Sequence, residues 1–545
     1  TMKILNKYGM GMALVAASSF MLTGCIDETF PTQNATTGQV EENSKAVEAM
    51  LMAVPAQLNT ETLGRGAHWD FGYPAIMHVR DVMTQDMATA NDNMYNQFSS
   101  WGQNVAQGID YAYAQMLWTA QTSYVNGANV IIRTLDPETA SDTQLGYLGA
   151  ALAYRAMFYL DMGREYEFLE NDAVEPLSPE GESVLGLTVP IVDENTTDEQ
   201  ARNNPRVDRA TLGAFIESDL KKAEEYITKL TLADKSMPHL DCVYGLYARL
   251  YMWLEKYDLA EEYARKAIDN CTGHVMTQEE ALNTSTGFNT ATPWMWGVHI
   301  NKESMINNLQ NYCSFFSCET TWGYSTPEAG SEIMIDRSMY ERISDTDWRK
   351  LMWKAPAGSA LDGQNTYCDP AIGEALKDYS SLKFRPAAGN VSDFSAGGEM
   401  DYPLMRVEEM YFTAAEAALR LDDLKSAREL MNTVMAERDP GYSANNRSGT
   451  LLGATTTTWT GSFLENILTH RRIELWGEYG RLFDVRRLGQ GIDRRTDDGF
   501  SEECISMMNR RNVNITKADT YDWVLTIPKA ELDANPNINE EDQNP

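Results

Sequence analysis

The residues with the clearest capacity for chemistry are aromatic side chains in segments that show no helical periodicity. Trp101, Trp322 and Tyr324 lie among Asn, Gly, Ser and Thr residues. An aromatic ring can stack on the apolar face of a sugar ring, while nearby amides, carboxylates and guanidinium groups bond its hydroxyls. The pattern therefore indicates a carbohydrate-binding surface, with candidate polar groups at Arg80 and Asp81.

Every such ring has an alternative role, which is to pack beneath a loop or inside a helical core. Both roles stay open for Trp322. The rings that we expect to pack are Trp69, Trp294, Trp296, Trp253 and Tyr263.

Motifs of known catalytic sites are absent from the sequence. It contains no G-x-S-x-G, no H-E-x-x-H, no phosphate-binding Gly-rich loop and no EF-hand loop. The histidines are scattered, and the spacing of Cys313 and Cys318 does not fit a zinc site. Carboxylates are abundant, but nothing selects a pair for glycoside hydrolysis. We therefore expect neither an enzyme nor a bound metal or cofactor.

A dense set of charged residues lies in the C-terminal third. Arg471-Arg472-Ile473-Glu474 precedes Trp476, and the run from Arg481 to Arg487 contains Phe483 and Asp484. Charges three or four apart on a helix can pair. The set fits either an active site or ion pairs that lock the last helices together, and we favour the ion pairs.

The N-terminal segment has the pattern of a bacterial lipoprotein signal. Lys3 and Lys7 precede an apolar run, Met10 to Leu22, which is too short to span a bilayer comfortably. Small residues then lead to Cys25, where such a signal places the cysteine that takes a diacylglyceryl group. We expect removal of residues 1–24 and lipidation of Cys25. The alternative is an ordinary secretory signal followed by a chance cysteine.

Composition limits the partners and the number of domains. Lys and Arg total 45 against 79 Asp and Glu, a formal net charge of −34. Such a surface repels phosphate backbones and anionic headgroups, so we expect no nucleic-acid partner and a membrane contact through the lipid anchor. No later apolar run reaches transmembrane length, and no Pro/Ser/Gly-rich linker divides the chain. We expect one body over residues 25–545.

Helical hairpins recur along the chain. Tyr244 to Asp269 and Glu408 to Glu437 each read as two amphipathic helices joined by a short turn, and Leu145 to Tyr166 is a partial third copy. They resemble tetratricopeptide repeats, although Ala248 and Glu255 occupy positions where glycine is usual. Because the copies are dispersed, they predict a mainly helical body and not an open solenoid. Further helices are expected at Gln103–Leu135, Arg209–Leu230 and Phe463–Trp476.

The clearest repeat also places two thiols at one end of a hairpin. Cys242 begins its first helix and Cys271 ends its second. Antiparallel helices bring those ends together, so the geometry allows a disulfide if the Cα atoms lie within about 7 Å.

Several short motifs, each weak alone, occur in one order across nearly the whole chain. They are Cys25 with trailing Asp27-Glu28, Leu148–Ala156, Val189–Val192, Asp219–Ala223, Asp347–Arg349, Arg406–Ala417, Arg471–Leu475, Arg481–Arg487, Ile527-Pro528 and Gln543–Pro545. The ordered set resembles the SusD/RagB family of Bacteroidetes outer-membrane nutrient-binding lipoproteins.

The resemblance implies an all-α, SusD-like fold in which four tetratricopeptide-like helix pairs scaffold a loop-rich, glycan-binding face. It also implies capture of a glycan without cleavage, and its delivery to a TonB-dependent transporter in the same outer membrane. The body would face the cell exterior. Arg80, Trp101 and Asn104 fall in the early region, and Trp322 in the later region, that supply ligand contacts in the family's starch-binding member.

The aromatic side chains of the helix pairs are needed for packing between helices. Two other segments that carry aromatic rings are therefore available to bind a ligand. We expect Trp69 to Trp101 and Tyr312 to Tyr324 to converge on one face, with Trp101 or Trp322 as the stacking platform. The candidate glycan contacts are Arg80, Asp81, Trp101, Asn104, Trp322 and Tyr324.

Two other functions stay open at this point. A surface scaffold that binds only a protein partner through its repeats predicts that the loop aromatics are buried. A surface glycoside hydrolase requires two carboxylates facing each other across a cleft at about 5–10 Å.

Overall fold

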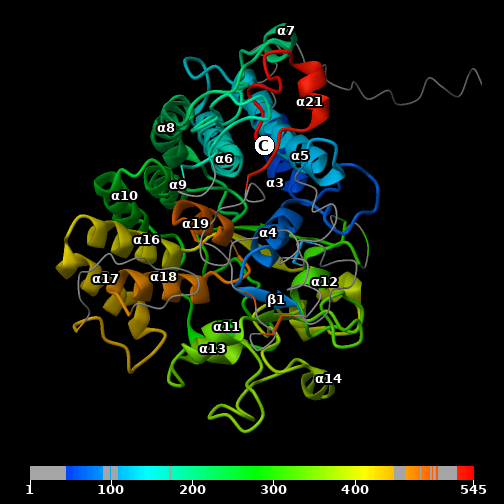
Figure 1. The fold of residues 1–545 in the computed structure, drawn as a ribbon, viewed down its shortest axis with the longest axis vertical. Coiled ribbons are helices and arrows are strands. Elements are labelled where there is room, and N and C mark those ends of the chain that lie inside the picture. The colour runs from blue at the N-terminus through cyan, green and yellow to red at the C-terminus, as the bar shows by residue number, and fades with distance from the viewer. Residues whose placement is uncertain are drawn as a thin grey trace, which may run out of the picture.

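The chain folds into a mainly helical protein with few strands, as the sequence predicts, in a computed structural model (Figure 1). The structure describes residues 44–89, 98–99, 108–170, 175–303, 305, 307, 309–446, 461–478, 480–490, 494, 499–500 and 524–545. Three of the predicted functional residues, Cys25, Trp101 and Asn104, lie outside this set.

Seven helices form an ordered stack, in which each helix packs against the next (Figure 1). In order they are α5 (Ala112–Thr134), α6 (Asp142–Tyr166), α8 (Arg209–Tyr226), α9 (Leu240–Trp253), α10 (Tyr257–Asp269), α16 (Val407–Arg420) and α17 (Leu424–Ala436). Helix α3 (Ser44–Gln57) packs on α5 and α6, and α18 (Phe463–Glu474) packs on α16.

Helix α6 shows why the helices approach so closely. Ser141 and Gln144 form a capping box that fixes its start. A Cβ atom at Gly149 would lie 2.7 Å from the backbone nitrogen of Ile227, so only glycine lets the end of α8 pack there. Nearly every residue of α6 is buried, because neighbouring helices pack against it on several sides.

The two predicted helical hairpins are confirmed. Helices α9 and α10 form the first, α16 and α17 form the second, and α10 packs against α16, so two repeats far apart in sequence are neighbours in space. Each hairpin turns through a residue in the left-handed region, Glu255 (φ 58°) and Asp422 (φ 61°). That conformation explains why glycine is usual at the position of Glu255.

Two small antiparallel sheets, which the sequence analysis did not predict, tie the long connecting segments together. Strand β1 (Met87–Thr89) pairs with β3 (Ile333–Ile335), with Met87 opposite Ile335. Strand β2 (Trp296–His299) pairs with β4 (Asp401–Met405), with Val298 opposite Tyr402 and an irregularity next to Trp296.

Short helices punctuate these connecting segments. They are α4 (Tyr73–Val82), α7 (Asp198–Ala201), α11 (Gln278–Leu282), α12 (Tyr312–Phe316), α13 (Arg337–Glu341), α14 (Pro370–Ala375), α15 (Phe394–Gly397), α19 (Arg481–Arg487) and α21 (Lys529–Ala534), with 3-10 turns η1 (Ile227–Lys229), η2 (Trp348–Met352) and η3 (Ala387–Gly389).

The disulfide that the first hairpin allows does not form. Cys242 and Cys271 are both free thiols. Asp241 closes this end of the hairpin instead, because its carboxylate accepts hydrogen bonds from the backbone N–H and the hydroxyl of Thr272 at 2.7 and 2.8 Å.

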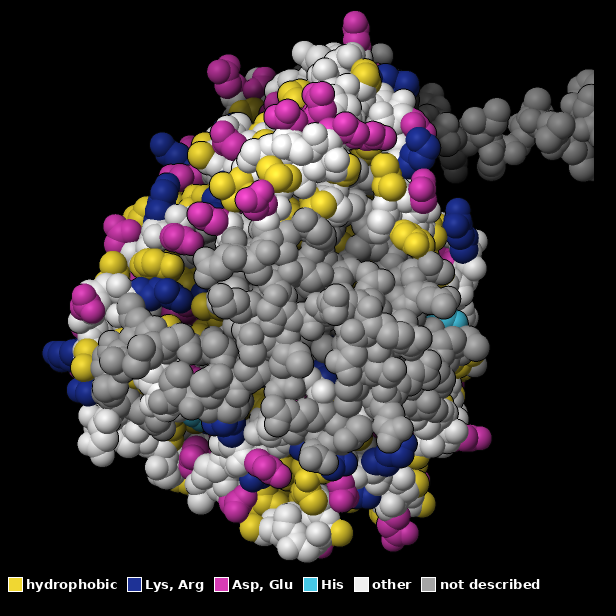
Figure 2. All heavy atoms as spheres, viewed as in Figure 1, with side chains coloured by type: hydrophobic (Ala, Val, Ile, Leu, Met, Phe, Trp, Pro, Cys, Tyr) yellow, Lys and Arg dark blue, Asp and Glu magenta, His cyan; other side chains and the backbone are white. Residues whose placement is uncertain are grey.

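One large cluster of buried hydrophobic side chains runs through the helical stack and the connecting segments. Trp294 and Trp296 are fully buried in it and Trp253 is nearly so, which confirms packing roles for these rings. Figure 2 shows Asp and Glu side chains spread over the upper helical part, in keeping with the acidic composition. Within the described ranges, no helix has the length and apolar character needed to cross a membrane.

Candidate functional site

The described part of the first ring-bearing segment meets the second segment, as predicted. The contact lies where the loop before α4 meets α12 and the loop that follows α12. The rings of Phe71 and Phe315 stack with centroids 4.7 Å apart. Beside them, His68 meets Tyr324 edge-on at 5.4 Å. The Gln310 side-chain amide donates to the carbonyl of Ala67 at 3.0 Å and fastens the two backbones together.

The loop after α12 is held rigidly against that helix. The backbone N–H groups of Tyr324 and Ser325 both donate to the carbonyl of Ser314 at 2.9 Å. A Cβ atom at Gly323 would lie 2.9 Å from the Cα of Ser314, so glycine permits this close approach. The tight turn places Trp322 and Tyr324 on either side of Gly323, and both rings are half-buried.

A third segment completes the site. The N–H of Thr321 donates to the carbonyl of Val391 at 2.9 Å, which brings α15 next to the loop. There the ring of Phe394 approaches Trp322 edge-on at 6.2 Å. Phe394 is 38% exposed, which is unusual for a large apolar side chain here.

We call the partly exposed rings of this region the aromatic surface. Burial lowers the pKa of His68, so its imidazole is neutral at pH 7 and the ring offers no positive charge to an anion. Rigid aromatic rings at the protein surface can stack on an apolar ligand face at low entropic cost. The aromatic surface comprises His68, Trp69, Trp322, Tyr324 and Phe394.

The structure contradicts Arg80 as a surface group for a ligand. Arg80 is 2% exposed and forms salt bridges with Asp161 at 3.1 Å and Glu165 at 2.8 Å on α6. Its guanidinium also lies over the ring of Phe483, 4.7 Å from the centroid. Arg80 therefore joins α4 to α6 and α19 in the interior.

Asp81 is likewise buried, at 4% exposure, so the structure also contradicts Asp81 as a surface group for a ligand. Burial, and then the negative charge of Asp86, raise the pKa of Asp81 to about 8. The physical reason for both errors is the burial of all of α4, which turns its polar side chains towards the core. A glycan hydroxyl reaches neither residue in this structure.

Trp101 and Asn104 lie outside the described residues, so their placement stays a prediction. Two rings of the aromatic surface were missed. Phe394 lies in a Ser/Gly-rich segment, the same signal that selected Trp322, and His68 directly precedes Trp69. Trp69 is half-buried and packs edge-on against Tyr113 at 5.9 Å, in agreement with its expected packing role.

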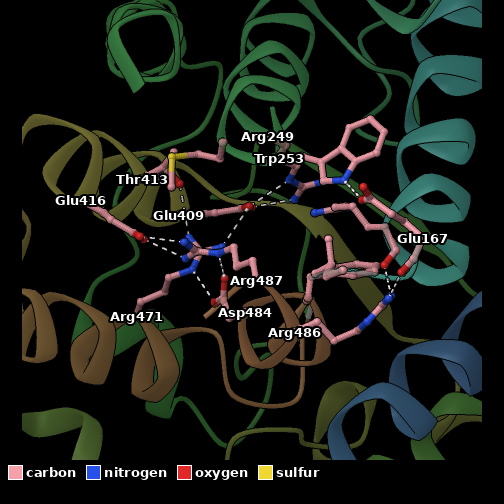
Figure 3. Close-up of a pocket in the computed structure, with 15 residues that line it drawn as sticks. Glu167, Arg249, Trp253, Glu409, Thr413, Glu416, Arg471, Asp484, Arg486 and Arg487 are labelled. Carbon is pink, nitrogen blue, oxygen red and sulfur yellow. Dashed lines mark hydrogen bonds and ion pairs between the residues drawn. The ribbon is translucent and has the colours of Figure 1, made fainter. Parts of the chain in front are cut away.

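The charged set of the last helices forms a buried ion-pair cluster, which Figure 3 shows between α16, α18, α19 and α9. Arg471 contacts Asp484 at 2.9 Å, and Arg487 contacts both Asp484 at 2.8 Å and Glu416 at 2.7 Å. Burial alone would raise the pKa of Asp484, but Arg471 and Arg487 outweigh it and lower the pKa.

These carboxylates therefore stay ionised and are poor proton donors. The cavity that they line holds only about 50 Å³, well below the roughly 300 Å³ at which ligand pockets begin. The geometry supports the interpretation that these ion pairs lock the last helices.

Comparisons with known proteins agree with this architecture. Residues 360–545 match the model of the SusD family. A SusD-like carbohydrate-binding protein from Bacteroides vulgatus is similar over 91% of this chain and 97% of its own, with a TM-score of 0.67 and 20% identity. A SusD superfamily protein from Bacteroides thetaiotaomicron is similar over 92% of this chain and 99% of its own, with a TM-score of 0.65 and 18% identity.

A third similar structure is surface glycan-binding protein A from Bacteroides thetaiotaomicron in complex with laminarihexaose. It covers 92% of this chain and 99% of its own, with a TM-score of 0.61 and 16% identity. No curated protein sequence matches the chain. The fold is therefore SusD-like along nearly the whole chain.

Proposed function

We propose, because residues 360–545 match the SusD family model and the fold is SusD-like, that the chain captures an oligosaccharide at the cell surface and delivers it to a partner TonB-dependent outer-membrane transporter. The observation that carries the proposal is the aromatic surface, where three segments far apart in sequence bring partly exposed rings together. Trp322 and Tyr324 are the proposed stacking rings, and Trp101 and Asn104 stay proposed contacts.

The exposure of these rings favours a glycan over a protein-only scaffold. A scaffold that used only its helical repeats would bury the loop aromatics, whereas Trp322 and Tyr324 are half-buried and Phe394 is 38% exposed. Their neighbours include the hydroxyl of Thr321, which is exposed, and the exposed Asp393 and Ser392. Rings with a polar border are what a sugar requires.

We propose binding without hydrolysis. In the buried ion-pair cluster, Arg487 and its neighbours lower the pKa values of Glu416 and Asp484 and hold both carboxylates ionised. A retaining or inverting glycosidase needs one carboxylic acid with a raised pKa next to the ligand.

Lipidation of Cys25 would hold the body at the outer membrane, facing the cell exterior and close to the transporter. Each buried methylene of the acyl chains contributes about 0.8 kcal/mol, so several chains together anchor a protein of this size. The anchor thereby keeps a weakly bound glycan near its route of uptake.

Titration calorimetry with neutral hexaoses tests the proposal. Laminarihexaose is the first probe, because a protein of similar fold was solved with it, followed by maltohexaose and cellohexaose. We expect weak binding of at least one, because sugar sites are shallow and wet. Chromatography of the same mixtures should show no shorter products. Turnover of any hexaose, or binding of none, contradicts the proposal.

A further inference from the structure

An open groove separate from the aromatic surface lies between α11, the turn η2 and the end of α17. Its volume is about 1020 Å³, at the upper end of the range for ligand pockets. Among the described lining residues, Trp348 is the one aromatic side chain, and it is half-buried. We call this feature the Trp348 groove.

The indole of Trp348 is fixed in place. Its Nε1 donates to the carbonyl of Glu437 at 2.5 Å, and its backbone N–H donates to the carbonyl of Arg438 at 3.1 Å. The guanidinium of Arg438 lies 5.0 Å from the ring centroid, and salt bridges to Glu474 and Glu408 at 2.8 and 2.9 Å hold it there. A ring held this firmly loses little conformational entropy when a ligand stacks on it.

The rest of the lining indicates which ligand fits. Exposed Glu279 and Glu437 disfavour an anion, and the charge of Arg438 is already paired inside the protein. Amides and hydroxyls offer both donors and acceptors to an uncharged, hydroxyl-rich molecule. They come from Gln278, Asn283, Gln364, Thr284, Ser285 and Thr366.

One short segment joins the groove to the aromatic surface. At one end, a Cβ atom on Gly389 would lie 2.5 Å from the carbonyl of Thr284, a groove residue. At the other end, Phe394 contacts Trp322. The five steps from Gly389 to Phe394 span at most about 18 Å. This separation is within the length of an extended oligosaccharide, so a chain bound at the aromatic surface is long enough to reach the Thr284 edge of the groove.

We infer that the Trp348 groove is a second binding site for the glycan, selective for neutral saccharides, with Trp348 as its stacking platform. The inference rests on the proposed function. The second site strengthens the binding of long glycans. Once one part of a glycan chain is bound at the aromatic surface, the local concentration of the rest of the chain at the Trp348 groove is raised.

Affinity electrophoresis of the purified full chain in gels that contain laminarin, starch or xyloglucan, and separately polygalacturonate, tests this inference. In the neutral gels that retard the wild type, Trp348→Ala should weaken the apparent affinity tenfold or more. Trp348→Phe, which keeps a ring, should retain most of it. Polygalacturonate should retard neither form.

A blocking variant guards against loss of folding in Trp348→Ala. Ser285 is exposed at the groove, so Ser285→Arg should obstruct the ligand without removing a buried contact, whereas Ala357→Arg is a charge-matched exposed control outside the groove. Wild-type retardation of both Trp348→Ala and Ser285→Arg would overturn the second site while leaving the proposed function intact. If no neutral gel retards the wild type, both fail.

Discussion

His68 and Tyr324 meet edge-on with their ring centroids 5.4 Å apart, although one precedes α4 and the other follows α12. This contact joins the first two of the three segments that form the aromatic surface. Because burial keeps His68 neutral near pH 7, the contact does not depend on a charge that physiological pH would change. The aromatic surface is therefore a preformed and uncharged platform.

Removing the two central rings should abolish most glycan binding. We expect Trp322→Ala combined with Tyr324→Ala to weaken the affinity for a bound hexaose by tenfold or more. Stacking of a base on an aromatic side chain is worth about 1–3 kcal/mol, and we apply that range by analogy. Leu421→Ala, at an exposed apolar position of the α16–α17 turn, is the control and should bind normally. An unchanged calorimetric affinity of the double variant would contradict the assignment of Trp322 and Tyr324 as stacking rings.

The helical part of the fold was predictable because its signals are local. The apolar residues of α9, α10, α16 and α17 recur every three to four positions. The turn residue Glu255 was also recognisable, because glycine is usual at its position. The strands β1 and β3 were not predictable, since each has only three residues and its partner lies far away in sequence.

The site was predictable only in part, for a related reason. Composition located Trp322 and Tyr324 correctly in a partly exposed loop. It failed for Arg80, because the carboxylates that pair with it, Asp161 and Glu165, come from a helix far along the chain. From sequence alone, a charged residue near aromatic residues of a loop-like segment is predicted to be exposed, because its buried partners cannot be identified.

Glu474 is the centre of the buried ion pairs and should be essential for stability. It contacts Arg349, Arg406 and Arg438 at 3.0, 3.0 and 2.8 Å. Glu474→Gln leaves those three guanidinium groups without their shared carboxylate, and breaking a buried pair typically costs about 3–5 kcal/mol. Urea denaturation should show a correspondingly lower midpoint.

The matched control for Glu474→Gln makes the same substitution at the surface. Glu429 contacts Lys425 at 3.8 Å, and both side chains are largely exposed. Exposed pairs contribute about 0–1 kcal/mol, so Glu429→Gln should hardly move the urea midpoint. Equal midpoints for the two variants would show that the buried cluster does not stabilise the fold as argued.

Replacement of Cys25 should separate the body from the membrane without unfolding it. Cys25→Ala removes the thiol that the lipid modification needs, and no helix in the described part of the chain is suited to span a bilayer. We expect the variant in the soluble fraction after cell lysis and the wild type in the outer-membrane fraction. Circular dichroism should give the same spectrum for both. A variant still recovered with the outer membrane would refute lipid anchoring through Cys25.

Asp81 should make the fold less stable as the pH rises. Burial and the neighbouring charge of Asp86 raise its folded-state pKa to about 8, against about 3.9 in an unfolded chain. Between those values the folded protein binds the extra proton, so this group lowers the free energy of unfolding with increasing pH, by up to about 1.4 kcal/mol per pH unit. Asp81→Asn removes the titration.

The difference between Asp81→Asn and the wild type isolates this effect from other titrating groups. Urea midpoints at pH 5, 6, 7 and 8 should show the variant gaining stability relative to the wild type at every step. The control Asp258→Asn makes the same substitution at an exposed position, and it reports any effect of the exchange that does not depend on burial. If the midpoints of Asp81→Asn ran parallel to the wild type from pH 5 to pH 8, Asp81 would have to be ionised inside the folded protein.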